Sequence, residues 1–108
     1  MHQDRTHALE ERIKEILAPY IERESNRSAL LTITRVTLSD RGKKALLYLS
    51  VLPETAEKDA LGFLKRKRST MRELLMEHLR IATIPFVDVT IDTGAKALHT
   101  IETLLRGA

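Results

Sequence analysis

Near the N-terminus, apolar residues recur at the spacing of one helix face. They are Leu9, Ile13, Ile16, Leu17, Tyr20 and Ile21. This pattern predicts an amphipathic helix over residues 5–24. Pro19 lies inside the pattern and removes one backbone donor, so we expect a kink there or an end to the regular helix. Residues 25–29 are polar and predict a connection.

Two segments rich in β-branched residues follow, and each predicts a strand: residues 30–38 and residues 44–52. The alternation of the first segment slips between Arg35 and Val36, which predicts a β-bulge. In the second segment Leu47, Leu49 and Val51 share one face. Residues 39–42, with Gly42 available for a positive φ, predict the turn of a hairpin.

Residues 55–82 contain no proline, yet their apolar pattern is interrupted. Ala60, Leu61 and Leu64 form one stripe, and residues 65–69 are all polar. A second stripe consists of Met71, Leu74, Leu75, His78, Leu79 and Ala82. We therefore predict two helices separated by a kink near residues 67–70. Thr70 with Glu73 fits a capping box for the second helix, and Ser69 is the alternative cap. Pro85 ends that helix.

The last third of the chain predicts one strand and one helix. From Phe86 to Asp92 residues alternate, with Val87, Val89 and Ile91 inward and Asp88, Thr90 and Asp92 outward. A short closing helix follows, with apolar positions Ala97, Leu98, Ile101, Leu104 and Leu105. The predicted fold is α+β, a three-stranded sheet with helices packed on one face. We expect residues 1–108 to form a single domain.

Composition narrows the class of protein. The chain has no Cys, so disulfides and thiolate metal sites are excluded, and a cytoplasmic location is the simplest interpretation. No segment approaches the roughly 20 apolar residues of a membrane span, and the N-terminus lacks the apolar core of a signal peptide. Aromatic residues make up only 4%, so base-stacking platforms are not expected.

The pattern of polar residues offers little for catalysis. Histidines at 2, 7, 78 and 99 have no metal-ligand spacing, and His78 is expected at the edge of the core. No glycine-rich phosphate loop or nucleophile elbow occurs. Asp88 and Asp92 share a strand face and could bind a cation, but we expect them to form its solvated side. We therefore expect no enzyme, no metal and no cofactor.

Positive charge is concentrated in one stretch. The net charge is +3 overall, but residues 61–80 alone carry six basic and two acidic side chains. Lys65, Arg66, Lys67 and Arg68 approach the predicted kink, Ser69 lies within it, and Arg72 follows in the next turn. The start of a helix presents free N–H groups, which together with cations suit a phosphate. Arg72 has no acid three or four residues away, which leaves it available for a ligand. Arg41, Lys43, Lys44 and Arg80 are second-tier candidates.

A resemblance to a known family rests on the segments Ile33–Ser39, Ala45–Leu52, Met71–Leu75, Leu79–Ile81 and Ile84–Pro85 and on the strand ending at Asp92. In this order and spacing, they resemble the bacterial ribosome-binding factor A family. The resemblance covers roughly residues 30–105. It implies a type II KH-like fold of core order αββααβ. It also implies a non-enzymatic factor for growth in the cold that binds small-subunit (30S) rRNA late in assembly. The family's Ala-any-Gly kink falls on Lys67-Arg68-Ser69, which has neither the alanine nor the glycine.

We therefore expect a cytoplasmic, monomeric factor whose partners are small-subunit rRNA and free small subunits. The kink would face the phosphates and read RNA by shape. Two alternatives remain: a KH-like module for other structured RNA or single-stranded DNA, and a protein-interaction domain with a basic docking edge. A small hydrolase using Asp88 and Asp92 is a distant third.

Overall fold

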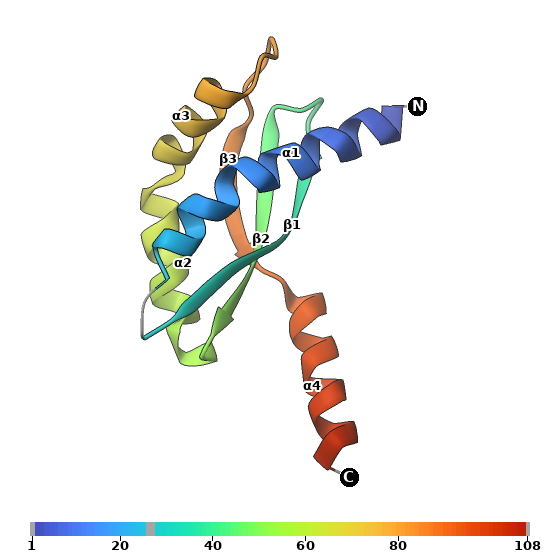
Figure 1. Cartoon of the computed structure of the whole chain (residues 1–108), viewed down its shortest axis with the longest axis vertical. Helices are drawn as coiled ribbons and strands as arrows, with labels where there is room; N and C mark the ends of the chain where they lie inside the picture. The colour runs from blue at the N-terminus through green and yellow to red at the C-terminus, as the bar shows by residue number, and fades with distance from the viewer. Residues whose placement is uncertain (1, 26–27, 108) are drawn as a thin grey trace.

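The computed structural model describes residues 2–25 and 28–107, and its elements follow the predicted order (Figure 1). In chain order the elements are α1 (His2–Arg23), β1 (Leu30–Ser39), β2 (Lys44–Leu52), the 3₁₀ helix η1 (Glu54–Ala56), α2 (Glu57–Arg66), α3 (Arg68–His78), β3 (Phe86–Ile91) and α4 (Thr93–Gly107). Helix α1 runs through Pro19 without ending. Asn26 and Arg27 of the predicted connection lie outside the described residues.

The sheet has the order β1-β2-β3, with β1 antiparallel and β3 parallel to the central strand. The register of β1 shifts between Ile33 and Arg35, so Thr34 is the extra residue of a bulge. Leu31 and Ile33 are buried before the bulge and Val36 after it, which is the slip in alternation that the sequence displays. The predicted bulge is confirmed close to its expected place.

The hairpin turn between β1 and β2 uses left-handed backbone. Asp40, Arg41 and Gly42 have φ of 51°, 56° and 81°, and the Gly42 N–H donates to the Ser39 carbonyl over 3.1 Å. The positive φ expected at Gly42 is confirmed. Two further residues share that conformation.

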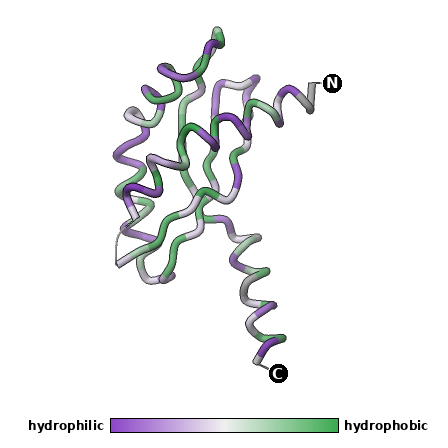
Figure 2. The backbone as a smooth tube through the Cα atoms, viewed as in Figure 1, coloured by the Kyte–Doolittle hydropathy of each residue, from purple (hydrophilic) through white to green (hydrophobic). Residues whose placement is uncertain are grey.

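Three helices cover one face of the sheet, as predicted. Helix α1 packs on β1 and α3, whereas α2 and α3 pack on β3. The core residues between these layers include Ile13, Leu17, Ile21, Ile33, Leu47, Leu49, Leu64, Met71, Leu75 and Val89. Figure 2 shows the apolar stretches of the strands beneath the helices. None of the helices in the described ranges is long and apolar enough to cross a membrane.

The predicted closing helix is present as α4, but it does not pack on the sheet. It projects away from the sheet (Figure 1), and its apolar positions Leu98, Ile101, Leu104 and Leu105 are all exposed. The radius of gyration is accordingly 14.9 Å, larger than the roughly 13 Å of a compact chain of this length. Tertiary packing, which the pattern does not encode, decides where an amphipathic helix lies.

Both ends of α3 differ from prediction. The helix begins at Arg68 with Lys67 as N-cap and no side-chain cap, so neither Thr70 nor Ser69 serves as the cap. It ends at His78 rather than near Pro85, because residues 79–85 are needed to bring Phe86 beside Lys44. His78 is therefore exposed and not at the core edge, with Nδ1 2.9 Å from the Leu74 carbonyl oxygen.

Candidate nucleic-acid interface

The predicted kink is a single residue, Lys67, between α2 and α3. Its N–H donates to the Leu64 carbonyl over 2.9 Å, and its own carbonyl accepts from the Met71 N–H over 3.0 Å. Its φ of −104° and ψ of 13° lie in the bridge region, which residues other than glycine adopt. The absence of the family's alanine and glycine at this point is therefore compatible with a kink.

The kink creates a groove between the two helices and β3. We call it the kink groove. It is lined by Lys65, Arg66, Arg68, Ser69, Arg72, Glu73, Met76, Phe86 and Val87 and has a volume of about 470 Å³. Four of its lining residues are cationic and one, Glu73, is acidic. A groove of this charge attracts an anion such as a phosphate diester.

Arg68 contacts both the end of α2 and β3. Its Nε donates to the Lys65 carbonyl over 2.9 Å, and its guanidinium lies 3.6 Å from the Asp88 carboxylate. Half of each of these side chains is exposed, so the ion pair adds little to stability. The carbonyl contact orients the guanidinium without neutralising it.

Arg72 has partners that the sequence does not reveal. Its Nη2 donates to the Ile84 carbonyl over 3.2 Å, and its guanidinium carbon lies 4.2 Å from the centre of the Phe86 ring. Its Nε is buried without a hydrogen-bond partner among the described residues. No ion pair of Arg72 with an acid on its own helix is present among the described residues, as predicted, but Ile84 of the α3–β3 connection and Phe86 of β3 hold its guanidinium in place.

Lys44 approaches the same region from the central strand. A second groove of about 350 Å³, the strand groove, is lined by Ser39, Lys44, Ala45, Leu46, Arg68, Phe86, Val87 and Asp88. Arg68 and Phe86 line both grooves. The two grooves therefore adjoin, and Lys44 adds a fifth cation to this surface.

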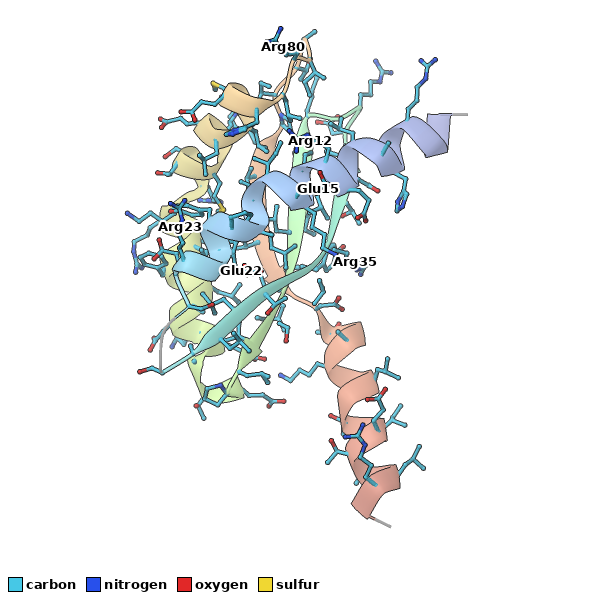
Figure 3. All side chains as sticks on the ribbon, viewed as in Figure 1. Arg12, Glu15, Glu22, Arg23, Arg35 and Arg80 are labelled. Carbon is cyan, nitrogen blue, oxygen red and sulfur yellow. The ribbon has the colours of Figure 1, made fainter. Side chains whose placement is uncertain are left out.

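The remaining candidates line neither groove. The Lys67 ammonium lies 5.6 Å from the centre of the Phe63 ring and does not line the kink groove. Arg41 lines a separate groove with Arg5 of α1. Lys43 and Arg80 are exposed, and Arg80 lies in the connection beyond the end of α3 (Figure 3). The structure thus gathers Lys65, Arg66, Arg68, Ser69, Arg72 and Lys44 along the two grooves, whereas the side chains of the other four candidates do not line them.

Two residues of this surface, Phe86 and Met76, were not anticipated. Phe86 is 64% exposed and Met76 is 47% exposed. The alternation of β3 carries the signal for Phe86: with Val87 and Val89 inward, the residue before them must face outward. Because only 4% of the residues are aromatic, the sequence alone does not predict an aromatic ring at the candidate RNA-binding surface.

Asp92 is not on the solvated side of its strand. It is 8% exposed, because the chain leaves β3 at Ile91 and turns into α4. Its carboxylate accepts from the Thr34 hydroxyl and, over 3.0 Å, from the Ala95 N–H, so it caps α4. These two hydrogen bonds, with the Arg35 guanidinium, lower the pKa of Asp92 despite its burial.

Asp88, by contrast, is half exposed, as predicted for the solvated side. Within the described part of the chain, no group of three or more His, Asp or Glu side chains could hold a metal ion.

Comparisons with known proteins agree with this architecture. The sequence model of the ribosome-binding factor A family matches residues 5–105. A ribosome-binding factor A from Desulfitobacterium hafniense is 30% identical over 110 residues, which cover 99% of this chain and 88% of the relative.

Solved structures give the same result. The crystal structure of ribosome-binding factor A from Thermus thermophilus superposes with a TM-score of 0.70 at 26% identity, covering 80% of this chain and 93% of that one. A homology model of the Thermus thermophilus protein, fitted into the cryo-EM map of a 30S complex, gives 0.67 at 27% identity, with 79% and 92% covered. The KH-like α+β fold is confirmed. With a family match over nearly its whole length, the chain belongs to the ribosome-binding factor A family.

Proposed function

We propose that the protein binds the small ribosomal subunit through rRNA phosphates at the kink groove and assists late maturation of that subunit. The observation that carries this proposal is the convergence of four cations from α2 and α3 on one groove beside β3. The relative from Thermus thermophilus, fitted into a 30S complex, supports the choice of partner.

The chemistry of the groove suits positioning on RNA rather than reading of sequence. Arg and Lys contacts to phosphate carry no sequence information, so specificity would come from RNA shape and from neighbouring ribosomal surfaces. Each phosphate contact should contribute about −0.7 to −0.9 to the slope of log K against log salt. The affinity should therefore fall steeply as salt is added.

The first test reverses two groove cations that form no ion pair among the described contacts. The double variant Lys65→Glu/Arg66→Glu should lose most co-sedimentation with small subunits at low salt and reduce the salt slope by about 1.4 to 1.8. The matched control Lys58→Glu/Arg106→Glu makes the same change in net charge at exposed positions outside the groove. Equal losses in both variants would refute the kink groove as the contact.

Competition with large subunits, free structured RNA and single-stranded DNA separates this proposal from a general nucleic-acid module. Nuclease treatment of the complex separates it from docking on an acidic protein. For the role in maturation, a deletion strain grown in the cold should accumulate immature small subunits and precursor rRNA on gradients. The Lys65→Glu/Arg66→Glu chain should fail to restore the normal profile, whereas the control chain should restore it.

A further inference from the structure

Phe86 is an exposed aromatic ring in a chain that has only four aromatic residues. Phe63 and Tyr20 are partly buried against the core, and the Tyr48 ring lies under the Arg35 guanidinium at 3.8 Å. Phe86 alone of the four is more than half exposed, at 64%. Like Arg68, it lines both the kink groove and the strand groove.

The ring is held in place from its backbone and from one side. The Phe86 N–H donates to the Lys43 carbonyl over 2.8 Å, Phe86 pairs with Lys44 in the sheet, and the preceding Pro85 is fully buried. The Arg72 guanidinium lies over the ring at 4.2 Å. Phe86 remains 64% exposed with Arg72 over its ring, so part of the ring surface is accessible to solvent.

An open, oriented ring among cations is the arrangement that binds an unstacked nucleobase. Stacking of a base on an aromatic side chain is tolerant of sequence and needs only a free base face. In double-helical RNA that face is covered by neighbouring bases, so only loops, bulges and single strands offer it. Arg68 and Lys44 line the strand groove together with Phe86, and both are cations that could bind the phosphates adjacent to such a base; Asp88, the acid of this groove, is paired with Arg68.

We propose that Phe86 is a stacking platform for one unpaired rRNA nucleotide, with Arg68 and Lys44 holding the adjacent phosphates. This inference rests on the proposed function and deepens it, since it adds a preference for unpaired RNA to a surface otherwise defined by charge. Stacking is not screened by salt as phosphate contacts are. The contribution of Phe86 should therefore be separable from that of the groove cations.

The test compares Phe86→Leu with Phe86→Tyr, because leucine keeps an apolar side chain and tyrosine keeps the ring. Phe86→Leu should weaken binding to small subunits and to a single-stranded hexa-adenylate by about tenfold, equivalent to roughly 1.4 kcal/mol, with an unchanged salt slope. Phe86→Tyr should bind like the parent. Lys65→Glu/Arg66→Glu, in contrast, should change the slope.

The variant Phe86→Trp allows stacking to be measured directly by fluorescence, because the chain contains no other tryptophan. Its fluorescence should be quenched by hexa-adenylate and not by duplex RNA of equal length. Equal losses of single-stranded and duplex binding in Phe86→Leu would overturn the platform and indicate that Phe86 only positions Arg72. Unchanged binding in Phe86→Leu, with loss in Lys65→Glu/Arg66→Glu, would overturn the platform and leave the proposed function intact. Absence of binding to small subunits by the parent chain would refute the proposed function itself, whereas binding to small subunits without binding to hexa-adenylate would overturn only the platform.

Discussion

Helices α3 and α4 have similar amphipathic sequences and opposite surroundings. Met71 and Leu75 of α3 are completely buried, whereas Leu104 and Leu105 of α4 are 69% and 73% exposed. Helix α3 belongs to the crossover between the parallel strands β2 and β3, so the chain must return across the sheet and bury its apolar stripe. Helix α4 follows the last strand and has no such constraint. The comparison shows that apolar periodicity predicts a helix but not what covers it.

What orients α4 is a set of polar contacts at its base. Asp92 accepts from the Ala95 N–H and from the Thr34 hydroxyl, and Thr34 is the bulge residue of β1. One turn further on, the Lys96 ammonium lies 3.1 Å from the Glu57 carboxylate of α2, which raises the pKa of Lys96. Helix α3 is thus held by apolar burial, and α4 by a cap and an ion pair.

The largest change in stability should come from a substitution in the buried apolar stripe of α3. Leu75→Ala removes a side chain with no exposed surface and should lower the free energy of unfolding by about 2–5 kcal/mol, because it leaves a cavity between α3 and the sheet. Urea denaturation followed by circular dichroism measures this loss. A loss below about 1 kcal/mol would contradict the packing of α3 described above.

An intermediate effect should come from the cap of α4. Asp92→Ala should lower the free energy of unfolding by about 0.5–2 kcal/mol at neutral pH, since it removes the acceptor for the Ala95 N–H. Asp92→Asn is the matched control, because asparagine also caps helices. It should lower the free energy of unfolding by less than Asp92→Ala does.

The effect of Asp92 should depend on pH. Its pKa is lowered in the folded chain, so its charge contributes stability above the unfolded value of about 3.9 and loses that contribution as the pH falls through the folded value. The difference between the parent and Asp92→Ala should therefore shrink only in acid. A difference that grew on acidification would contradict a lowered pKa.

The smallest change in stability should come from a substitution in the exposed apolar stripe of α4. Leu104→Ala changes a residue that is 69% exposed and should shift the free energy of unfolding by less than about 0.5 kcal/mol, measured beside Leu75→Ala under identical conditions. A loss as large as that of Leu75→Ala would show that α4 packs on the body in solution, and the contrast between the two helices would disappear.

Much of the fold could be predicted from local patterns. The β2 boundaries, the bulge in β1, the positive φ at Gly42 and the break between α2 and α3 all leave a signature in neighbouring residues. The cations at the kink are recognisable for the same reason, since Lys65, Arg66 and Arg68 are consecutive or nearly so. Features carried by a few adjacent residues depend on local sterics and periodicity, which the chain displays directly.

The tertiary structure alone decided which distant residues meet. It gave Arg72 its partners from the α3–β3 connection and from β3, turned Asp92 inward onto Thr34, left α4 uncovered and placed Phe86 in the lining of two grooves. Each of these outcomes joins groups far apart in the chain or depends on the path of the backbone between elements. The amino-acid order specifies the helices, the strands and the basic stretch, but contacts between them follow from packing the whole chain around one core.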